Sequence, residues 1–178
     1  MVGSITLIGY GIGVLGAGLG IGLIGYACCM GTARQPEMAG RLFTDFIKEN
    51  KPLFFFLYYG SLDEAGHCRG WYGEDYMEWQ RTLDAEVGSV IQALKDAGIY
   101  DDTVIILSAD HGGKDLGHGG FTLLELETPF IVCGKEIREN CEFPLTVMQY
   151  DTAAVIADLL GIRIPEDWRG RPFPQIYQ

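Results

Sequence analysis

The hydrophobic pattern predicts an α/β domain in most of the chain. Continuous apolar runs of strand length cover residues 53–59, 103–107 and 129–133. Apolar positions recur with helical spacing over 74–97, and a shorter helix is expected over 151–160. Runs that are apolar at every position are typical of strands buried on both faces of a parallel sheet. The alternation of strands and helices therefore predicts a parallel α/β sheet with right-handed crossovers.

The first 33 residues differ from the rest because they carry no charged side chain. Residues 5–30 are long enough to cross a bilayer as one helix, and their many glycines would let neighbouring helices approach closely in lipid. In water each interior glycine would cost a helix about 1 kcal/mol relative to alanine. We therefore predict a glycine-rich apolar helix and polar loop over 1–38, and a second domain over 39–178.

The position of the basic residues after the apolar run predicts the topology. If the helix is inserted in a membrane, the positive-inside rule places the C-terminal domain in the cytoplasm. If the helix is not inserted, a soluble cytoplasmic protein is expected.

Two other interpretations of the N-terminal segment are less favoured. Gly11 to Gly16 match the pattern G-x-G-x-x-G of dinucleotide-binding folds, but the acidic Glu37 follows a loop-like Arg-Gln-Pro rather than a strand. A secretory signal would need a basic region before the apolar run, and none is present.

Charge and cysteine content exclude some classes of function. The net charge of −11 would repel a nucleic acid backbone. The five cysteines are odd in number and form no C-x-x-C pair, which argues against a disulfide framework or a zinc ribbon.

All three histidines fall in short motifs that follow predicted strands. Asp63 and His67 come after the first strand, Asp110 and His111 come directly after the second, and His118 begins a His-Gly-Gly sequence. Each motif alone is compatible with a capped turn or a surface imidazole. Together they favour a metal site, because carboxylates and imidazoles suit zinc or manganese and the glycines permit tight loops.

These motifs resemble the C-terminal half of the alkaline phosphatase superfamily, especially its phosphodiesterase and nucleotide pyrophosphatase branch, over residues 45–173. The resemblance implies that Asp63, His67 and His118 bind one divalent ion, while Asp110 and His111 bind a second. The expected ion is zinc, with manganese as the alternative. It also implies a small-molecule phosphate ester as substrate, with sulfate esters and phosphonates left open. Two such ions would stabilise the attacking and leaving oxygens of an in-line displacement.

The N-terminal segment resembles the first helix and polar loop of the ATP synthase c subunit over residues 3–44. The resemblance rests on a glycine repeat from Gly16 to Gly22 and on the Arg-Gln-Pro sequence that ends at Pro36. The charged residues that follow, among them Asp45 and Lys48, argue against the second membrane helix of that family. Ion translocation is therefore not expected.

The chain departs from the complete phosphatase pattern in one respect. No aspartate precedes Asp45, and no early hydroxyl stands where the family places its Thr or Ser nucleophile. We therefore predict a metal-dependent hydrolase of phosphate mono- or diesters that is weak, inactive or completed by other protein. The alternatives are a membrane-anchored c-subunit-like protein and a non-catalytic metal-binding domain. The oligomeric state stays open.

Overall fold

The computed structural model describes residues 39–178, and the chain divides into two compact units, Met1–Phe46 and Ile47–Gln178. The predicted glycine-rich helix, the polar loop and the G-x-G-x-x-G pattern lie outside the described residues. Within the described range, no helix combines the length and apolar character needed to cross a membrane.

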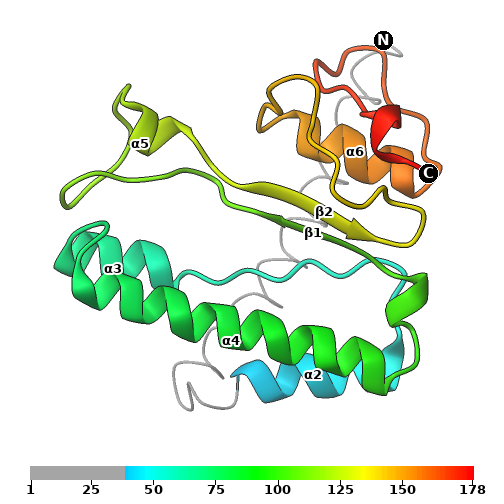
Figure 1. The fold of residues 1–178 in the computed structure, drawn as a ribbon, viewed down its shortest axis with the longest axis horizontal. Coiled ribbons are helices and arrows are strands. Elements are labelled where there is room, and N and C mark those ends of the chain that lie inside the picture. Colours follow the sequence, from blue (N-terminus) through cyan, green and yellow to red (C-terminus); the bar gives the residue numbers. More distant parts are fainter. Residues whose placement is uncertain (1–38) are drawn as a thin grey trace, which may run out of the picture. The chain divides into compact units, whose positions relative to one another are not determined.

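The described elements form a mixed α/β arrangement (Figure 1). In chain order they are the helices α2 (Ala39–Asn50), α3 (Ser61–Arg69) and α4 (Glu74–Asp96), the 3-10 helix η2 (Tyr100–Asp102), the strand β1 (Val104–Ser108), the helix α5 (Leu123–Leu126), the strand β2 (Phe130–Gly134), the helix α6 (Asp151–Leu159) and the 3-10 helix η3 (Pro174–Ile176). Both α4 and α6 lie where the periodicity predicts them. The left-handed Gly98, with φ of +67°, follows the end of α4, as a helix C-terminus favours.

The sheet of the described chain is a two-stranded antiparallel pair. β1 and β2 pair from Val104 opposite Gly134 to Ser108 opposite Phe130. The two strands lie at the predicted positions, but their orientation corrects the prediction of a parallel sheet. A parallel pair needs a crossover connection, usually a helix. Here the connection runs out to the four-residue α5 and returns, so the second strand runs back along the first (Figure 1).

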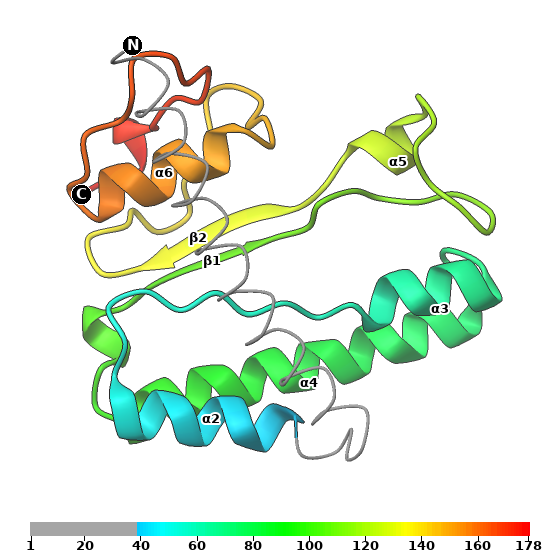
Figure 2. The ribbon, with the colours of Figure 1, turned by 180° about the vertical axis from the view of Figure 1, so that it is seen from behind.

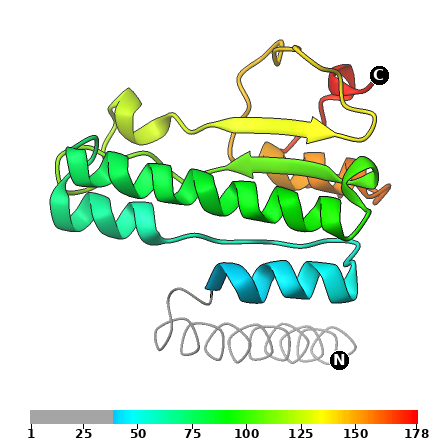
Figure 3. The ribbon, with the colours of Figure 1, turned by 60° about the horizontal axis from the view of Figure 1, so that its bottom comes forward.

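The predicted strand over 53–59 is not part of the described sheet. The segment runs alongside α4 (Figures 1 and 3), and exposure alternates along it as in an extended chain. Phe54, Phe56 and Tyr58 are 53%, 75% and 65% exposed, whereas the residues between them are less exposed. The prediction of a strand buried on both faces is therefore wrong. An apolar run favours an extended and buried chain. A β-strand also needs a neighbouring strand with which its backbone can form hydrogen bonds.

The core lies on one face of the β1–β2 pair, beneath α6 and the C-terminal segment (Figure 2). Val155 of α6 is buried with Ile137, Phe173 and Ile176. Alternate residues of both strands pack against this cluster, since period-two alternation places them on one face: Val104, Ile106, Phe130 and Val132. α3 and α4 form a separate helical hairpin, side by side in Figure 3. α3 also lies beside the loop that follows β1, where the backbone N–H of Trp71 bonds to the carbonyl oxygen of Asp115.

Candidate metal centre

Asp63 and His67 lie on the helix α3, which the sequence analysis did not predict. Their spacing of four residues places both side chains on one helix face. Asp63 is in the first turn, where the helix dipole favours a negative charge. The Nδ1 atom of His67 is 2.9 Å from the carbonyl oxygen of Leu116, which belongs to the loop after β1. α3 thus supplies a carboxylate and an oriented imidazole.

His111 and His118 come from the loop after β1, which turns back on itself between them. Two backbone hydrogen bonds between Lys114 and Gly117, of 2.9 and 3.0 Å, close this turn. The two imidazole rings stack with centroids 3.7 Å apart and planes 17° from parallel. The Nδ1 atom of His111 is 2.8 Å from the carbonyl oxygen of Gly112. The turn therefore brings the second and third histidines together beside α3.

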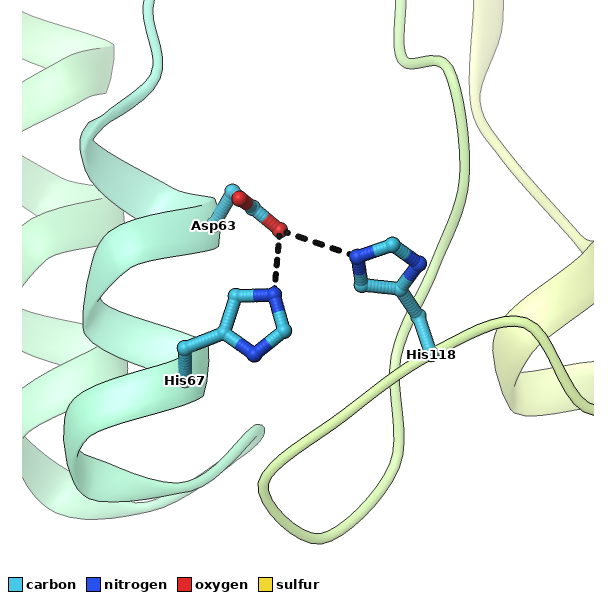
Figure 4. A group of neighbouring side chains, drawn as sticks. All are labelled: Asp63, His67 and His118. Atoms are coloured by element: carbon cyan, nitrogen blue, oxygen red, sulfur yellow. Dashed lines mark ion pairs between the residues drawn. The ribbon is translucent and has the colours of Figure 1, made fainter.

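The three histidines converge on one oxygen atom of Asp63. Its Oδ1 is 3.5 Å from Nε2 of His67, 3.9 Å from Nε2 of His111 and 3.7 Å from Nε2 of His118. Figure 4 shows Asp63 with two of these rings, His67 from the same helix and His118 from the loop. These separations exceed the range of a hydrogen bond. The Asp63 side chain is 41% exposed as a whole, yet its Oδ1 is buried and has no hydrogen-bond partner among the described residues.

The hydrogen bonds at Nδ1 determine whether the Nε2 atoms that face this oxygen carry a proton or a lone pair. In a neutral imidazole, an Nδ1 that donates to a carbonyl leaves Nε2 with a lone pair and no proton. His67 and His111 both have a carbonyl partner at Nδ1. Their Nε2 atoms and the carboxylate of Asp63 then face one another as acceptors. A proton or a metal ion between the members of this group would remove the unfavourable contact.

The spacing of the ligand atoms fits a metal ion. The ligand atoms of Asp63, His67 and His118 all lie within 4.8 Å of one another. In a tetrahedral zinc site with bonds near 2.0–2.1 Å, neighbouring ligand atoms are about 3.3 Å apart. The separations of Asp63 Oδ1 from the Nε2 atoms of His67 and His118, 3.5 and 3.7 Å, would need only a small contraction around an ion. Neutral imidazoles with carbonyl partners at Nδ1 are also the usual form of metal-binding histidines.

Asp110 and His111, the residues expected to hold a second ion, are adjacent at the edge of the cluster. The Oδ2 atom of Asp110 is 3.5 Å from Nε2 of His111, and its side chain is 72% exposed. Its Oδ1 accepts a hydrogen bond of 3.1 Å from the backbone N–H of His111. Within the described part of the chain, the geometric group with metal-ligand spacing contains Asp63, His67 and His118 but neither of these two residues.

Two residues that hold the histidine-bearing loop in place were not predicted from the sequence, Gln149 and Glu125. Gln149 donates from Nε2 to the carbonyl oxygens of Ala109 and Asp110, at 2.6 and 2.8 Å, and so fixes the backbone that carries His111. No local sequence signal indicates this contact, which spans about forty residues. Glu125, by contrast, has a recognisable signature, because Thr122 and Glu125 form a capping box at the start of α5.

Glu125 ties the His-Gly-Gly segment to α5. Its carboxylate accepts hydrogen bonds from the hydroxyl of Thr122, at 2.6 Å, and from the backbone N–H of Gly120, at 2.7 Å. These bonds hold the pKa of the Glu125 carboxyl below its ordinary value of 4.5. The loop of His118 is therefore anchored on both sides, at Leu116 by the imidazole of His67 and at Gly120 by Glu125.

The mixed α/β elements thus bring a carboxylate and three histidines together beside α3. The family model described as type I phosphodiesterase / nucleotide pyrophosphatase matches residues 30–131, more than half of the 178-residue chain. The chain therefore belongs to the type I phosphodiesterase / nucleotide pyrophosphatase family. The matched range includes all five residues that were expected to bind metal.

Curated relatives of the C-terminal part act on phosphate and sulfate groups, by their names. GPI ethanolamine phosphate transferase 2 from Aspergillus fumigatus is 26% identical over 135 residues, which cover 68% of this chain and 18% of the relative. Arylsulfatase A from Bos taurus is 34% identical over 116 residues, which cover 58% of this chain and 20% of the relative. The chain thus spans about a fifth of the length of these relatives.

The fold is also that of solved sulfatase structures. A chain from Bacteroides thetaiotaomicron, described as a sulfatase, superposes with a TM-score of 0.51 and is 19% identical in sequence. The superposition covers 80% of this chain and 39% of the other. At this level of identity the likeness shows the fold alone.

The N-terminal resemblance is confirmed as well. The family model of the ATP synthase c subunit matches residues 6–47. The ATP synthase c subunit of Bifidobacterium longum strain DJO10A is 48% identical over 44 residues, which cover 25% of this chain and 59% of the relative. The two family models overlap over residues 30–47, so one chain carries segments similar to two different families.

Proposed function

We propose that the chain is a metal-dependent hydrolase module that acts on phosphate mono- or diesters. One observation carries the proposal. The buried Oδ1 of Asp63 has no hydrogen-bond partner within the described chain and faces the Nε2 atoms of His67, His111 and His118 at 3.5–3.9 Å. A positively charged ion would remove the unfavourable contact between these acceptors. The acidic composition of the chain, with a net charge of −11, also suits a cation.

In this proposal Asp63, His67 and His118 hold one divalent ion, zinc in the first place and manganese as the alternative. Three protein ligands leave a fourth position open to water or to an ester oxygen, as in catalytic zinc sites. Asp110 and His111 are the residues for a second ion beside the first. When bound, such ions supply Lewis acidity toward the ester oxygens and lower the pKa of water.

The remaining contributions come from the chain itself. The carbonyl oxygens of Leu116 and Gly112 hold His67 and His111 in the tautomer whose Nε2 lone pair points into the centre. The carboxylate of Asp63 supplies negative charge where a cation would lie. No residue is assigned as the nucleophile, so we propose that hydrolysis is weak unless other protein completes the centre.

The names of the relatives support a phosphate ester as substrate, with a sulfate ester as the alternative. A phosphate ester is favoured by the match to the phosphodiesterase and nucleotide pyrophosphatase family model and by the ethanolamine phosphate transferase. The name of the arylsulfatase favours a sulfate ester. The match to the ATP synthase c subunit over residues 6–47 supports a second candidate function, a membrane-anchored protein. The cytoplasmic position of its C-terminal domain rests on the positive-inside rule alone.

The experiment that tests the proposal is the metal stoichiometry of the purified chain by mass spectrometry. We expect one tightly bound ion in the wild type, lost in His67→Ala and retained in His111→Ala, since a three-ligand site needs His67. Glu64→Ala, an exposed carboxylate beside Asp63 on the same helix, is the matched control and should retain the ion. A wild-type chain without a bound ion would contradict the metal-dependent function.

Hydrolysis of p-nitrophenyl phosphate, bis(p-nitrophenyl) phosphate and p-nitrocatechol sulfate then distinguishes the substrate classes. Activity on the first two that disappears in His67→Ala would support the phosphate ester. Activity on the sulfate ester alone would replace it with the alternative.

A further inference from the structure

Trp71 lies in the short turn between α3 and α4, close to the candidate metal centre. Its backbone N–H donates a hydrogen bond of 2.9 Å to the carbonyl oxygen of Asp115, in the loop between His111 and His118. The turn after α3 is therefore attached to the loop after β1 at this residue. Gly70, with φ of +93°, precedes it and adopts a backbone conformation that favours glycine.

The indole ring of Trp71 is held between two glycines that belong to different elements. A Cβ atom added at Gly66 on α3 would lie 2.5 Å from the indole carbon Cδ2. A Cβ atom added at Gly113, two residues after His111, would lie 1.9 Å from the indole carbon Cε2. Both distances are far shorter than van der Waals contact, so the ring fits only because both positions are glycine. Both α3 and the loop thus leave room for the ring at a glycine.

The same ring contacts two of the proposed metal ligands. Its centroid is 5.0 Å from that of His67, with the planes 85° apart, and 6.0 Å from that of His118, with the planes 69° apart. Both are edge-to-face arrangements, which aromatic rings favour. His67 comes from α3 and His118 from the loop. Trp71 therefore contacts one ligand from each of the two elements that must meet at the ion.

We propose that Trp71 is a positioning residue of the metal centre. Its indole ring acts as a spacer that holds His67 and His118 at the separation that one ion requires. This inference rests on the proposed function. Metal sites need their ligands held within about 0.5 Å of the productive geometry by neighbours that are themselves locked by packing. A ring enclosed by two glycines and two imidazoles meets that requirement.

The first test is the affinity for Zn²⁺ of Trp71→Ala and Trp71→Phe, measured by titration of the metal-free full-length chain. We expect the alanine variant to bind about 10–100-fold more weakly, the range seen when residues that support metal ligands are removed. The phenylalanine variant, which keeps a ring in the same space, should recover part of the affinity. Trp79→Phe is the matched control, because Trp79 is 48% exposed on α4, and it should bind as the wild type does.

The second test uses the glycine contact to separate positioning from general loss of stability. Gly113→Ala alone should weaken Zn²⁺ binding, because the new Cβ meets the indole ring. The same change made in Trp71→Ala should weaken it no further, because the clashing ring is absent. If Gly113→Ala weakens Zn²⁺ binding equally in the wild type and in Trp71→Ala, the inference is overturned.

The outcomes of the two proposals can be told apart. If the wild type binds Zn²⁺ and Trp71→Ala binds it with equal affinity, the positioning role is wrong and the metal site stands. If the wild type binds neither Zn²⁺ nor Mn²⁺, both proposals are wrong. Thermal unfolding of the metal-free variants shows whether each one is folded, and Trp71→Phe keeps the test decisive if the alanine variant is not.

Discussion

Asp151 is a buried charge that joins the start of α6 to the C-terminal segment. Its side chain is fully buried, and its carboxylate accepts hydrogen bonds from the backbone N–H groups of Met148, at 2.8 Å, and Arg171, at 3.0 Å. The Nε atom of Arg171 lies 3.8 Å from the same carboxylate. A buried carboxylate is tolerated only when it is paired in this way. This residue therefore holds together the region in which the core cluster forms.

Asp151→Ala should lower the free energy of unfolding by about 2–4 kcal/mol, because it removes a buried carboxylate and leaves two partly buried N–H donors without this acceptor. Asp151→Asn, which retains one oxygen acceptor, should lose less. Urea unfolding measures both values. Asp84→Ala, an exposed aspartate on α4, is the control and should change the free energy by less than about 0.5 kcal/mol. An Asp151→Ala variant as stable as this control would show that the buried contacts contribute nothing.

At the scale of elements, α5 and the segment before it depend on the ionisation of Glu125. The pKa of this carboxyl is lowered chiefly by the Thr122 hydroxyl and then by the Gly120 N–H. A group whose pKa is lower in the folded state stabilises that state above its unfolded pKa. The stabilisation is lost as the pH falls through the pKa that the group has in the folded state. The anchoring of the His-Gly-Gly segment should therefore weaken below pH 4.5, the ordinary pKa of the group.

Hydrogen exchange can measure this anchoring at the amides of Gly120 and Thr122. In the wild type we expect their protection factors to fall as the pH is lowered from about 6 to about 3.5. In Glu125→Ala protection should be low throughout this range, because the acceptor is absent. Glu127→Ala, an exposed neighbour, should behave as the wild type. Equal protection in Glu125→Ala and the wild type at the upper end of this range would contradict the role of the capping box.

The sequence predicted some elements and missed others, because helical periodicity and apolar runs each carry only part of the information. Helical periodicity reports burial along one face, so it located α4 and α6 correctly. Apolar runs located β1 and β2 but could not give their relative direction, which depends on the path of the connection. The motif of Asp63 and His67 was placed after a predicted strand, and the helix α3 that carries it was not predicted, although a spacing of four residues fits one face of a helix.

The candidate site was predictable only in part. Its histidines and carboxylates were found because the motifs concentrate rare residue types near strand ends. Trp71 and Gln149 were not found, because their roles depend on contacts with residues distant in the sequence or on the space left by glycines. Whether the five predicted residues bind metal stays a prediction.

At the scale of the whole molecule, the chain combines segments similar to two families, and the site residues fall in one of them. The five proposed ligands all belong to the unit Ile47–Gln178: Asp63, His67, Asp110, His111 and His118. We predict that deletion of residues 1–38 leaves the bound ion in place, because no proposed ligand is removed. Mass spectrometry of the shortened chain measures this.

The same deletion tests the N-terminal segment. If that segment inserts in a membrane, the full-length chain should need detergent for solubility and the shortened chain should not. Loss of the ion on deletion would show that residues 1–38 contribute to the centre. A full-length chain that is equally soluble without detergent would argue against insertion.

The convergence of α3 and the loop after β1 on one oxygen has a consequence for folding. The hydrogen bond from His67 to Leu116 spans 49 residues, and the whole of α4 and β1 lies between the groups that would share an ion. A metal bound there acts as a removable cross-link that closes this long loop. A ligand that binds only the folded state stabilises it in proportion to the logarithm of the ligand concentration. The concentration of free metal ion would therefore set the unfolding temperature of the protein as well as its chemistry.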